Sequence, residues 1–222
     1  MIPLRDTQPS YSTPVVTIGL IIVNVLVFFY EVALDDFSRN EFIIAHGVVP
    51  ARFYLDTLIT SMFLHGGWMH LIGNMWFLWI YGDNVEDILG KWKYLLFYLT
   101  CGIIAALAHV FFNAGSKIPT VGASGAIAGV MGAYMAKFPH SRVLTLVPLF
   151  IFVTTVEIPA TFILAYWLLL QVFSGVGEVA QSQLSKGGVA WWAHIGGFAA
   201  GYILIRVMKT RDRYWRRPDL HW

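Results

Sequence analysis

Ser124 and His194 are the side chains in this sequence whose types and surroundings suit covalent chemistry. Ser124 lies in the run 122–125, Gly-Ala-Ser-Gly, at the predicted start of a helix. A serine in the first turn of a helix lies beside free backbone N–H groups and the positive end of the helix dipole, which are the donors that an oxyanion requires. Ser124 is therefore a candidate nucleophile, and the alternative is a small residue that packs among Gly and Ala.

Small residues follow both side chains at a spacing of four: Gly125 and Gly129 after Ser124, and Gly197 and Gly201 after His194. Such a spacing lets two helices approach closely. His194 lies three residues before Gly197 and so shares its helix face. Close packing would bring the imidazole within reach of the Ser124 hydroxyl, as a nucleophile and its general base require. The alternative for His194 is a single hydrogen bond that holds two helices together.

His70 and Asn74 are a further candidate pair on another predicted helix. They are four residues apart and share one helix face, and both side chains can donate hydrogen bonds. Beside a carbonyl under attack they would stabilise the negative charge that develops on oxygen. A metal site at His65 and His70 is the weaker interpretation, because a spacing of five turns two side chains about 140° apart and the sequence supplies no further ligands nearby.

The composition indicates the environment in which these side chains act. The 222 residues are 57% hydrophobic and only 13% charged, whereas a soluble domain is about 45–50% apolar and about 25% charged. Nine Trp, sixteen Phe and ten Tyr add bulky apolar surface. These values exclude a soluble enzyme, a disordered chain and a nucleic-acid binder, and they indicate an integral membrane protein in contact with the lipid bilayer.

Long stretches without charge predict membrane-spanning helices. About 20 helical residues cross the hydrocarbon layer of about 30 Å, and an unpaired strand or loop cannot satisfy its backbone in lipid. The expected fold is an all-α bundle of six transmembrane helices in a single domain, 1–222, with spans at about 14–34, 58–81, 93–113, 121–138, 158–175 and 189–208. The uncharged run 143–156 is too short to span and contains Pro148, so an interfacial connector is expected there, with residues 157–159 opening the fifth helix.

Lys and Arg residues set the expected orientation. With both termini in the cytoplasm, eleven of the fifteen lie inside, and four lie outside: Arg39, Arg52, Lys117 and Lys186. Positive charge concentrates on the cytoplasmic side of membrane proteins, so the sequence predicts an N-in, C-in topology with a basic cytoplasmic tail at 209–222. The short tails favour a minimal prokaryotic form in the plasma membrane, with the candidate site opening to the external or periplasmic side.

Other protease chemistries lack their residues. No carboxylate pair falls within a predicted span, because the acidic residues considered lie at or beyond helix ends: Asp35, Asp36, Glu41, Asp56, Asp83, Glu86, Asp87, Glu157 and Glu178. An intramembrane aspartyl protease therefore has no residues to work with, and zinc-dependent hydrolysis lacks a His-Glu-x-x-His motif. No metal and no cofactor are expected. The remaining histidines are expected to be incidental or structural: His46, His109, His140 and His221.

Together these motifs resemble the rhomboid family of intramembrane serine proteases. The similar segments are 65–90, 121–134 and 192–202, with 142–149 in support. The resemblance implies that Ser124 is the nucleophile and His194 the base of a dyad without an acid. It implies that His70, Asn74 and the Ser124 backbone amide form the oxyanion hole, and that the substrates are transmembrane segments of single-pass membrane proteins. The glycines expected to pack the helices around the site are Gly122, Gly125, Gly129, Gly197 and Gly201.

Two positions depart from the family pattern. Family members often carry an aromatic residue four after the serine, which stacks on the histidine, but this position is Ala128. Either another residue orients His194, or its ring is less constrained than in those family members. A Trp-Arg pair often precedes the second helix, whereas this sequence has Asp56-Thr57, which concerns the first external loop rather than the chemistry.

Two other functions stay open. A non-proteolytic membrane chaperone or adaptor would bind client helices without cleaving them, and the intact Ser124 and His194 argue against it. A channel or solute transporter would line a pore with His70, Asn74 and His194. The first and last three predicted helices show no internal repeat and no midplane charge, and both features disfavour a transporter.

Overall fold

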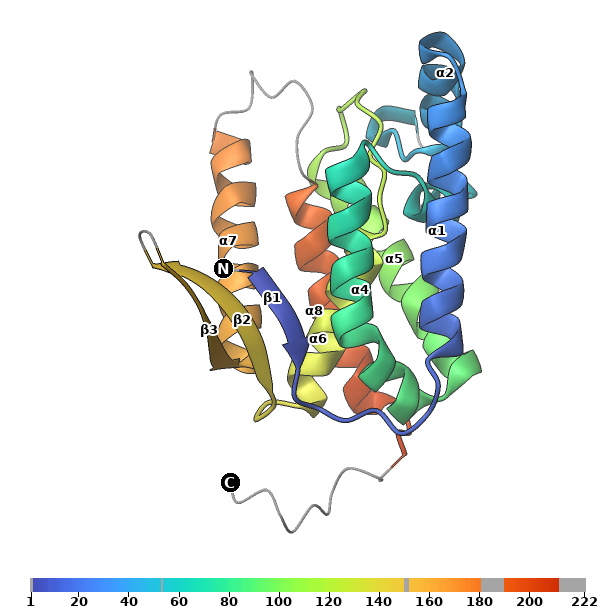
Figure 1. The fold of residues 1–222 in the computed structure, drawn as a ribbon. Helices are drawn as coiled ribbons and strands as arrows, with labels where there is room; N and C mark the ends of the chain where they lie inside the picture. The colour runs from blue at the N-terminus through green and yellow to red at the C-terminus, as the bar shows by residue number, and fades with distance from the viewer. Residues whose placement is uncertain (1, 53, 150–151, 181–189, 212–222) are drawn as a thin grey trace.

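In the computed structural model, the described residues 2–52, 54–149, 152–180 and 190–211 form one helical bundle with a small sheet at its side (Figure 1). The helices are α1 Val15–Ala33, α2 Asp36–His46, α3 Thr57–Thr60, α4 Trp68–Leu89, α5 Lys91–Phe112, α6 Ser124–Lys137, α7 Ala160–Ala180 and α8 Trp191–Val207, with 3-10 turns at Pro50–Arg52 and Ser61–Phe63. The strands are β1 Ile2–Asp6, β2 Arg142–Leu149 and β3 Phe152–Pro159.

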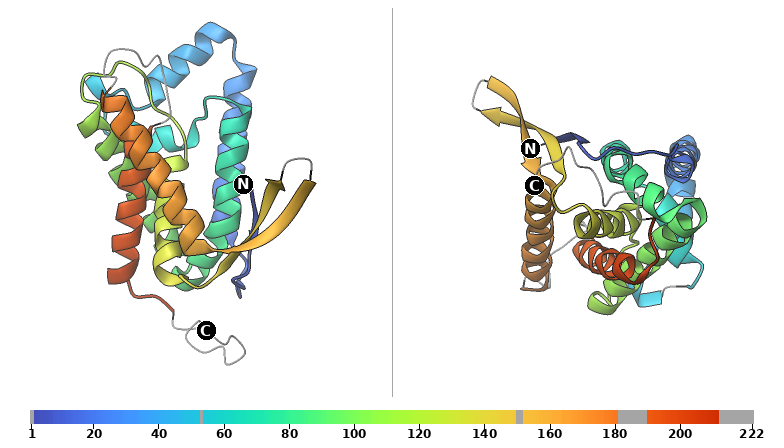
Figure 2. Two further views of the ribbon diagram at one scale, coloured as in Figure 1. Left: turned by 90° about the vertical axis from the view of Figure 1, so that its left-hand side faces the viewer. Right: turned by 90° about the horizontal axis from the view of Figure 1, so that it is seen from below.

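Helix α6 lies at the centre of the bundle. It contacts α8 most extensively and packs also on α5 and α4. Helix α1 covers the far side of α4, and α7 stands on the other side of the molecule, against α8 (Figure 2). Nearly every residue of α6 from Gly125 to Tyr134 is buried, so this helix is the core of the fold.

The central helix is also short. With 14 residues against the 22 of α4, α6 is about 12 Å shorter at 1.5 Å per residue. The chain descends into the bundle from its upper end before α6 begins (Figure 1). The first residue of α6, Ser124, therefore lies below the ends of the neighbouring helices.

The segment expected to be an interfacial connector forms a β-hairpin between α6 and α7, so the all-α prediction is wrong there. Strands β2 and β3 pair antiparallel from Arg142↔Pro159 to Leu149↔Phe152, and β1 adds to the outer side of β2. β-Branched residues make up five of the eight positions of β3 and three of the eight of β2, and such residues favour the pleated conformation. Residues 157–159 belong to β3, and the helix that was expected to begin there starts at Ala160.

The N-terminal segment closes the lower end of the bundle. Trp76 Nε1 donates to the Pro3 carbonyl at 2.7 Å, and Asn84 Nδ2 donates to the Gln8 carbonyl at 3.1 Å. The backbone N–H of Tyr11 donates to Asp87 Oδ2 at 2.9 Å. Because β1 also pairs with β2, residues 2–12 connect α4 to the hairpin that leads into α7.

Carboxylates lie within the helices rather than only at or beyond their ends. Helix α4 continues to Leu89, past the predicted end at 81, and contains Asp83, Glu86 and Asp87. The buried carboxylate of Glu86 accepts hydrogen bonds from the first turn of α1. The donors are the N–H of Val16 at 2.9 Å and the N–H and Oγ1 of Thr17, each at 2.8 Å.

Glu31 is a further carboxylate that the sequence reasoning passed over. It lies in α1 and is fully buried. Its oxygens accept the backbone N–H of His65 at 3.1 and 3.4 Å. A hydrogen-bonded carboxylate of this kind is tolerated inside an apolar bundle because its charge has a fixed donor.

Among the described helices, three are long and apolar enough to cross a membrane by length and composition: Val15–Ala33, Lys91–Phe112 and Ala160–Gly177. Helix α4 is long but carries three acidic residues in its last two turns. Helices α6 and α8 have 14 and 17 residues. Position 189 of the predicted sixth span and positions 212–222 of the predicted basic tail lie outside the described residues.

Candidate active site

Ser124 and His194 lie in hydrogen-bond contact at the centre of the bundle. Ser124 is the first residue of α6, and His194 lies in the first turn of α8. The distance from Ser124 Oγ to His194 Nε2 is 2.8 Å. The imidazole is buried and the hydroxyl is half-buried, so a hydroxyl and a potential proton acceptor share a site that solvent reaches only in part.

Glycines let α6 and α8 come close enough for this contact. A Cβ at Gly197 would lie 2.0 Å from the Gly125 carbonyl oxygen, and a Cβ at Gly201 would lie 1.9 Å from that of Gly129. Both distances are far shorter than any real Cβ contact, so no side chain fits at either position. The two small-residue faces identified in the sequence therefore face each other one and two turns away from the Ser124–His194 pair.

His70 and Asn74 lie on one face of α4 beside Gly122. Gly122 has a φ of +128°, and a Cβ there would lie 2.8 Å from His70 Nε2 and 3.6 Å from Asn74 Nδ2. The Gly66 N–H donates to His70 Nδ1 at 3.4 Å, so in a neutral ring the proton is on Nε2, the nitrogen next to Gly122. Asn74 Nδ2 is buried and has no hydrogen-bond partner among the described residues. Two donors thus lie beside the residues that lead into Ser124.

All four predicted site residues line one cavity of about 880 Å³. It lies between α4 and α7, along the first two turns of α6. Its polar lining residues include Ser124, His194, His70 and Asn74, and its apolar lining includes Met69, Phe77, Ile127, Met131 and Trp167. The cavity can hold an apolar chain and presents a hydroxyl, an imidazole and two further hydrogen-bond donors to it.

Helix α7 supplies the contacts that orient His194, and sequence reasoning missed them. Gln171 Oε1 lies 2.7 Å from His194 Nδ1, and the Trp167 ring packs on the imidazole with centroids 5.5 Å apart. Ala128 makes neither contact. The signal in the sequence is Gln171 itself, a polar amide within the predicted span 158–175.

Comparison with known families assigns the chain. Residues 52–211 match the rhomboid domain family, which is well over half of the 222 residues. The chain belongs to the rhomboid family.

Three rhomboid relatives illustrate the similarity. Rhomboid protein 1, mitochondrial, of Saccharomyces cerevisiae is 30% identical over 166 residues, which cover 71% of this chain and 44% of that protein. RHOMBOID-like protein 4 of Arabidopsis thaliana is 32% identical over 157 residues, covering 71% and 35%. Rhomboid protease GluP of Bacillus subtilis is 33% identical over 126 residues, covering 55% and 24%. The chain spans less than half the length of each of these relatives.

Membership of the rhomboid family and the apolar helices together make this chain an integral membrane protein. The apolar side chains exposed on its surface are large and numerous. On α7 alone, the rhomboid exposes Phe162, Tyr166, Leu169 and Phe173. Aromatic and aliphatic groups of this size are stable at the surface of a helix when lipid replaces water around them.

His65 and His109 of this rhomboid lie outside the Ser124–His194 contact. His109 Nε2 lies 2.9 Å from Thr120 Oγ1 and so ties α5 to the loop before α6. His65 is buried, packs against the His70 ring with centroids 5.2 Å apart, and has no partner for its ring nitrogens among the described residues. Across those residues, no group of three or more His, Cys, Asp or Glu side chains gathers in a way that could hold a metal ion.

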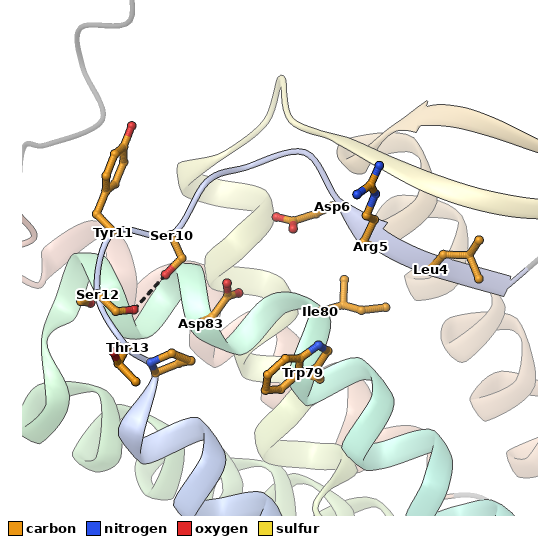
Figure 3. A pocket seen from close by; sticks show the side chains of 11 residues that line it. Leu4, Arg5, Asp6, Ser10, Tyr11, Ser12, Thr13, Trp79, Ile80 and Asp83 are labelled. Carbon is orange, nitrogen blue, oxygen red and sulfur yellow. Dashed lines mark hydrogen bonds between the residues drawn. The ribbon is translucent and has the colours of Figure 1, made fainter.

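A second cavity, of about 510 Å³, lies at the lower end of the rhomboid bundle, between the N-terminal segment and α4 (Figure 3). Asp6 and Asp83 both point into it, and Trp79 and Ile80 form part of its apolar wall. Burial raises the pKa of the Asp6 carboxyl to about 6, although the Tyr134 hydroxyl bonded to it acts in the opposite direction. This cavity holds two carboxyl groups, those of Asp6 and Asp83, and lies at the opposite end of α6 from Ser124.

Proposed function

We propose that this rhomboid is an intramembrane serine endopeptidase that cleaves transmembrane segments of single-pass membrane proteins with Ser124 and His194 as its catalytic dyad. The distance of 2.8 Å from Ser124 Oγ to His194 Nε2 carries the proposal. A Ser–His pair at hydrogen-bond distance is the arrangement of an activated nucleophile with its general base. Membership of a family that includes a rhomboid protease supports the same chemistry.

The dyad acts in two steps. His194 Nε2 removes the hydroxyl proton as Ser124 Oγ attacks the peptide carbonyl carbon, and the resulting imidazolium gives that proton to the leaving amine as the C–N bond breaks. A water molecule, deprotonated by the same imidazole, then attacks the ester carbonyl. The second step releases the carboxylic acid product and restores the Ser124 hydroxyl.

Three donors are suited to stabilise the oxyanion of each step. They are the Nε2–H of His70, the amide N–H of Asn74 and the backbone N–H of Ser124, which is free because it lies in the first turn of α6. A donor aimed at the developing charge in a site of low dielectric typically contributes on the order of 10²–10³ in rate. No buried counter-charge is needed for this chemistry.

The cavity supports the proposed substrate class. Its apolar lining, which includes Met69 of α4 and Ile127 and Met131 of α6, suits the side chains of a membrane helix. A helical substrate hides its carbonyl carbons behind its own hydrogen bonds, so the segment must unwind before Ser124 can attack it. We therefore expect substrates with residues that weaken a helix close to the scissile bond.

We further propose six membrane spans with both termini on the cytoplasmic side, in a prokaryotic plasma membrane, so that the cavity opens to the external face. The excess of Lys and Arg on one side supports this orientation. Reporter fusions at the C-terminus and in the 113–119 loop test it. A C-terminal reporter that is active only outside the cell would refute the N-in, C-in topology.

Purified protein in detergent or proteoliposomes, incubated with a single-pass model substrate, tests the proteolytic function. Cleavage is expected for the wild type and for Ser116→Ala, a serine in the loop before α6 that serves as the control. No cleavage is expected for Ser124→Ala or His194→Ala. A fluorophosphonate should label the wild type and the control only. Binding of the substrate without cleavage or labelling would refute the protease and favour a chaperone or adaptor.

A further inference from the structure

The hydrogen bond between Gln171 and His194 joins two buried side chains from different helices. Gln171, in the middle of α7, is 5% exposed, and His194, in α8, is 7% exposed. The distance from Gln171 Oε1 to His194 Nδ1 is 2.7 Å. Burial removes competing water, so the imidazole nitrogen on the side away from Ser124 has this amide as its partner.

A second contact fixes which end of the amide faces the histidine. Gln171 Nε2 donates to the Trp167 carbonyl oxygen, one turn earlier on α7, at 3.1 Å. A backbone carbonyl can only accept hydrogen bonds, so the NH₂ group of the amide must face it. The amide oxygen of Gln171 is therefore directed at His194 and can only accept.

This orientation determines where the imidazole carries its proton. Because Gln171 Oε1 accepts, the hydrogen bond at 2.7 Å requires an N–H at Nδ1 of His194. In the neutral ring Nε2 then has the lone pair, and Nε2 is the nitrogen 2.8 Å from Ser124 Oγ. The amide thus selects the one neutral tautomer that can take a proton from the serine.

We infer that Gln171 is the third member of the site, a positioning residue that holds His194 in its reactive tautomer and ring orientation; this rests on the proposed function for the reaction it serves. Trp167 packs on the ring from the same helix, with the two ring planes 38° apart. Helix α7 therefore provides both the hydrogen bond and the aromatic contact that position 128, an alanine, does not provide.

An amide is better suited to this location than a carboxylate. Gln171 sits in an apolar helix of which the window Ala160–Gly177 is a candidate membrane span. A charge there is costly, whereas a neutral amide satisfied by two hydrogen bonds is not. Gln171 Oε1 can accept the Nδ1–H in both the neutral and the protonated ring, so the hydrogen bond is retained throughout the proton transfer.

The test compares Gln171→Met, which keeps the length of the side chain and removes the amide, with Gln171→Glu, which keeps an acceptor oxygen. Asn24→Leu is the matched control. Asn24 is also a buried amide bonded to a carbonyl four residues earlier in its own helix, at 2.7 Å, but it lies in α1 away from the site. Gln171→Met and Asn24→Leu both remove a buried amide that is bonded within its own helix, but only Gln171→Met changes the environment of His194.

In Gln171→Met we expect kcat to fall about 10- to 100-fold, while KM stays within about twofold of the wild type. This loss of kcat is smaller than the ~10⁴-fold loss in a serine protease whose histidine partner is exchanged for one that enforces the wrong tautomer. Gln171→Glu should recover kcat to within a few-fold of the wild type, and Asn24→Leu should leave it unchanged. Solid-state ¹⁵N NMR of histidine-labelled protein, with His194 assigned from His194→Gln, should show Nδ1–H in the wild type and its loss in Gln171→Met.

Retention of the Nδ1–H tautomer and of kcat in Gln171→Met would overturn the inference. So would a loss of activity in Gln171→Met that Gln171→Glu fails to recover while the tautomer stays unchanged, since that pattern indicates a packing role alone. The NMR comparison is independent of proteolysis. If the wild type neither cleaves substrate nor reacts with a fluorophosphonate, the proposed function fails, and the tautomer still decides the role of Gln171.

Discussion

The Tyr134 hydroxyl donates a hydrogen bond to Asp6 Oδ2 at 2.5 Å, and this contact ties the central helix to the N-terminal strand. Tyr134 lies near the lower end of α6, the helix that begins with Ser124. Asp6 ends β1, which pairs with the hairpin leading into α7. A half-buried carboxylate thus lies where three parts of the fold meet, and its protonation state affects how firmly they are held.

The stability of the protein should decrease as the pH rises from about 4 to about 6. Burial raises the pKa of Asp6 from 3.8 to about 6 in the folded protein, so the folded state binds more protons than the unfolded state in this range. The free energy of unfolding then falls with pH until Asp6 is ionised in both states. Asp6→Asn, which keeps an acceptor for Tyr134, should remove this slope and raise the free energy of unfolding at pH 7–8 by about 1–3 kcal/mol.

Thermal or denaturant unfolding in detergent at several pH values measures this effect. Asp56→Asn, at an exposed position before α3, is the control and should leave the slope in place. Asp83 faces Asp6 across the lower cavity (Figure 3), so the removal of one charge also relieves repulsion between the two carboxylates. An unchanged slope in Asp6→Asn would show that another group dominates.

The approach of α6 and α8 predicts a strong position dependence of glycine substitution. In Gly201→Ala the new Cβ would lie 1.9 Å from the Gly129 carbonyl oxygen, and two backbones must separate to admit it. We expect a loss of about 3 kcal/mol or more in the free energy of unfolding, the upper end of overpacking effects, together with loss of fluorophosphonate labelling. Gly19→Ala in α1, where nothing lies within 4 Å of the Cβ, should cause neither loss.

The positions of the long helices could be predicted from charge-free stretches, because a membrane helix must be apolar and of a given length. The predicted 14–34 and 93–113 differ from α1 and α5 by one or two residues at each end. The predicted 58–81 differs more, since residues 57–63 form two short turns and α4 begins only at Trp68. The helix also continues past the predicted end at 81, because Glu86 and Asp87 accept hydrogen bonds from residues 11–17 and so remain inside the bundle.

The remaining features depend on contacts that a sequence pattern does not contain. The run 143–156 has the apolarity of a helix, and the pairing of its two halves with each other, together with the pairing of 143–146 with residues 2–6, decides for strands. Spacing on a helix face identified His70, Asn74 and the glycines, because such a pattern is local. Gln171 is 23 residues from His194 on another helix, and only the packing of α7 on α8 brings the two together.

The buried carboxylate of Glu31 should matter through its acceptor oxygens rather than its charge. Glu31→Ala leaves the backbone N–H of His65 without its partner, and an unsatisfied buried N–H costs about 1–3 kcal/mol. Glu31→Gln keeps an acceptor and should stay within about 1 kcal/mol of the wild type. Unfolding in detergent distinguishes the two variants, with Glu41→Ala at an exposed position of α2 as the control. An equal loss of unfolding free energy in Glu31→Ala and Glu31→Gln would show that the charge of Glu31, and not its acceptor oxygens, stabilises the fold.

Asn74 provides the sharpest test of oxyanion stabilisation. Its Nδ2 group is buried with no hydrogen-bond partner among the described residues and lines the cavity that holds Ser124. In Asn74→Ala we expect kcat to fall by about 10²–10³ with little change in KM, because a donor to the oxyanion acts only in the transition state. The folded state should not be weakened, since no protein hydrogen bond of Nδ2 is lost.

Asn84→Ala, on the same helix, is the matched control for this substitution. Asn84 donates to the Gln8 carbonyl at 3.1 Å at the lower end of α4, so its removal should lower the free energy of unfolding and leave kcat unchanged. The two asparagines then show opposite effects on stability and on rate. A rise in KM at constant kcat in Asn74→Ala would mean that the amide binds the substrate in its ground state, and the oxyanion role of Asn74 would have to be abandoned.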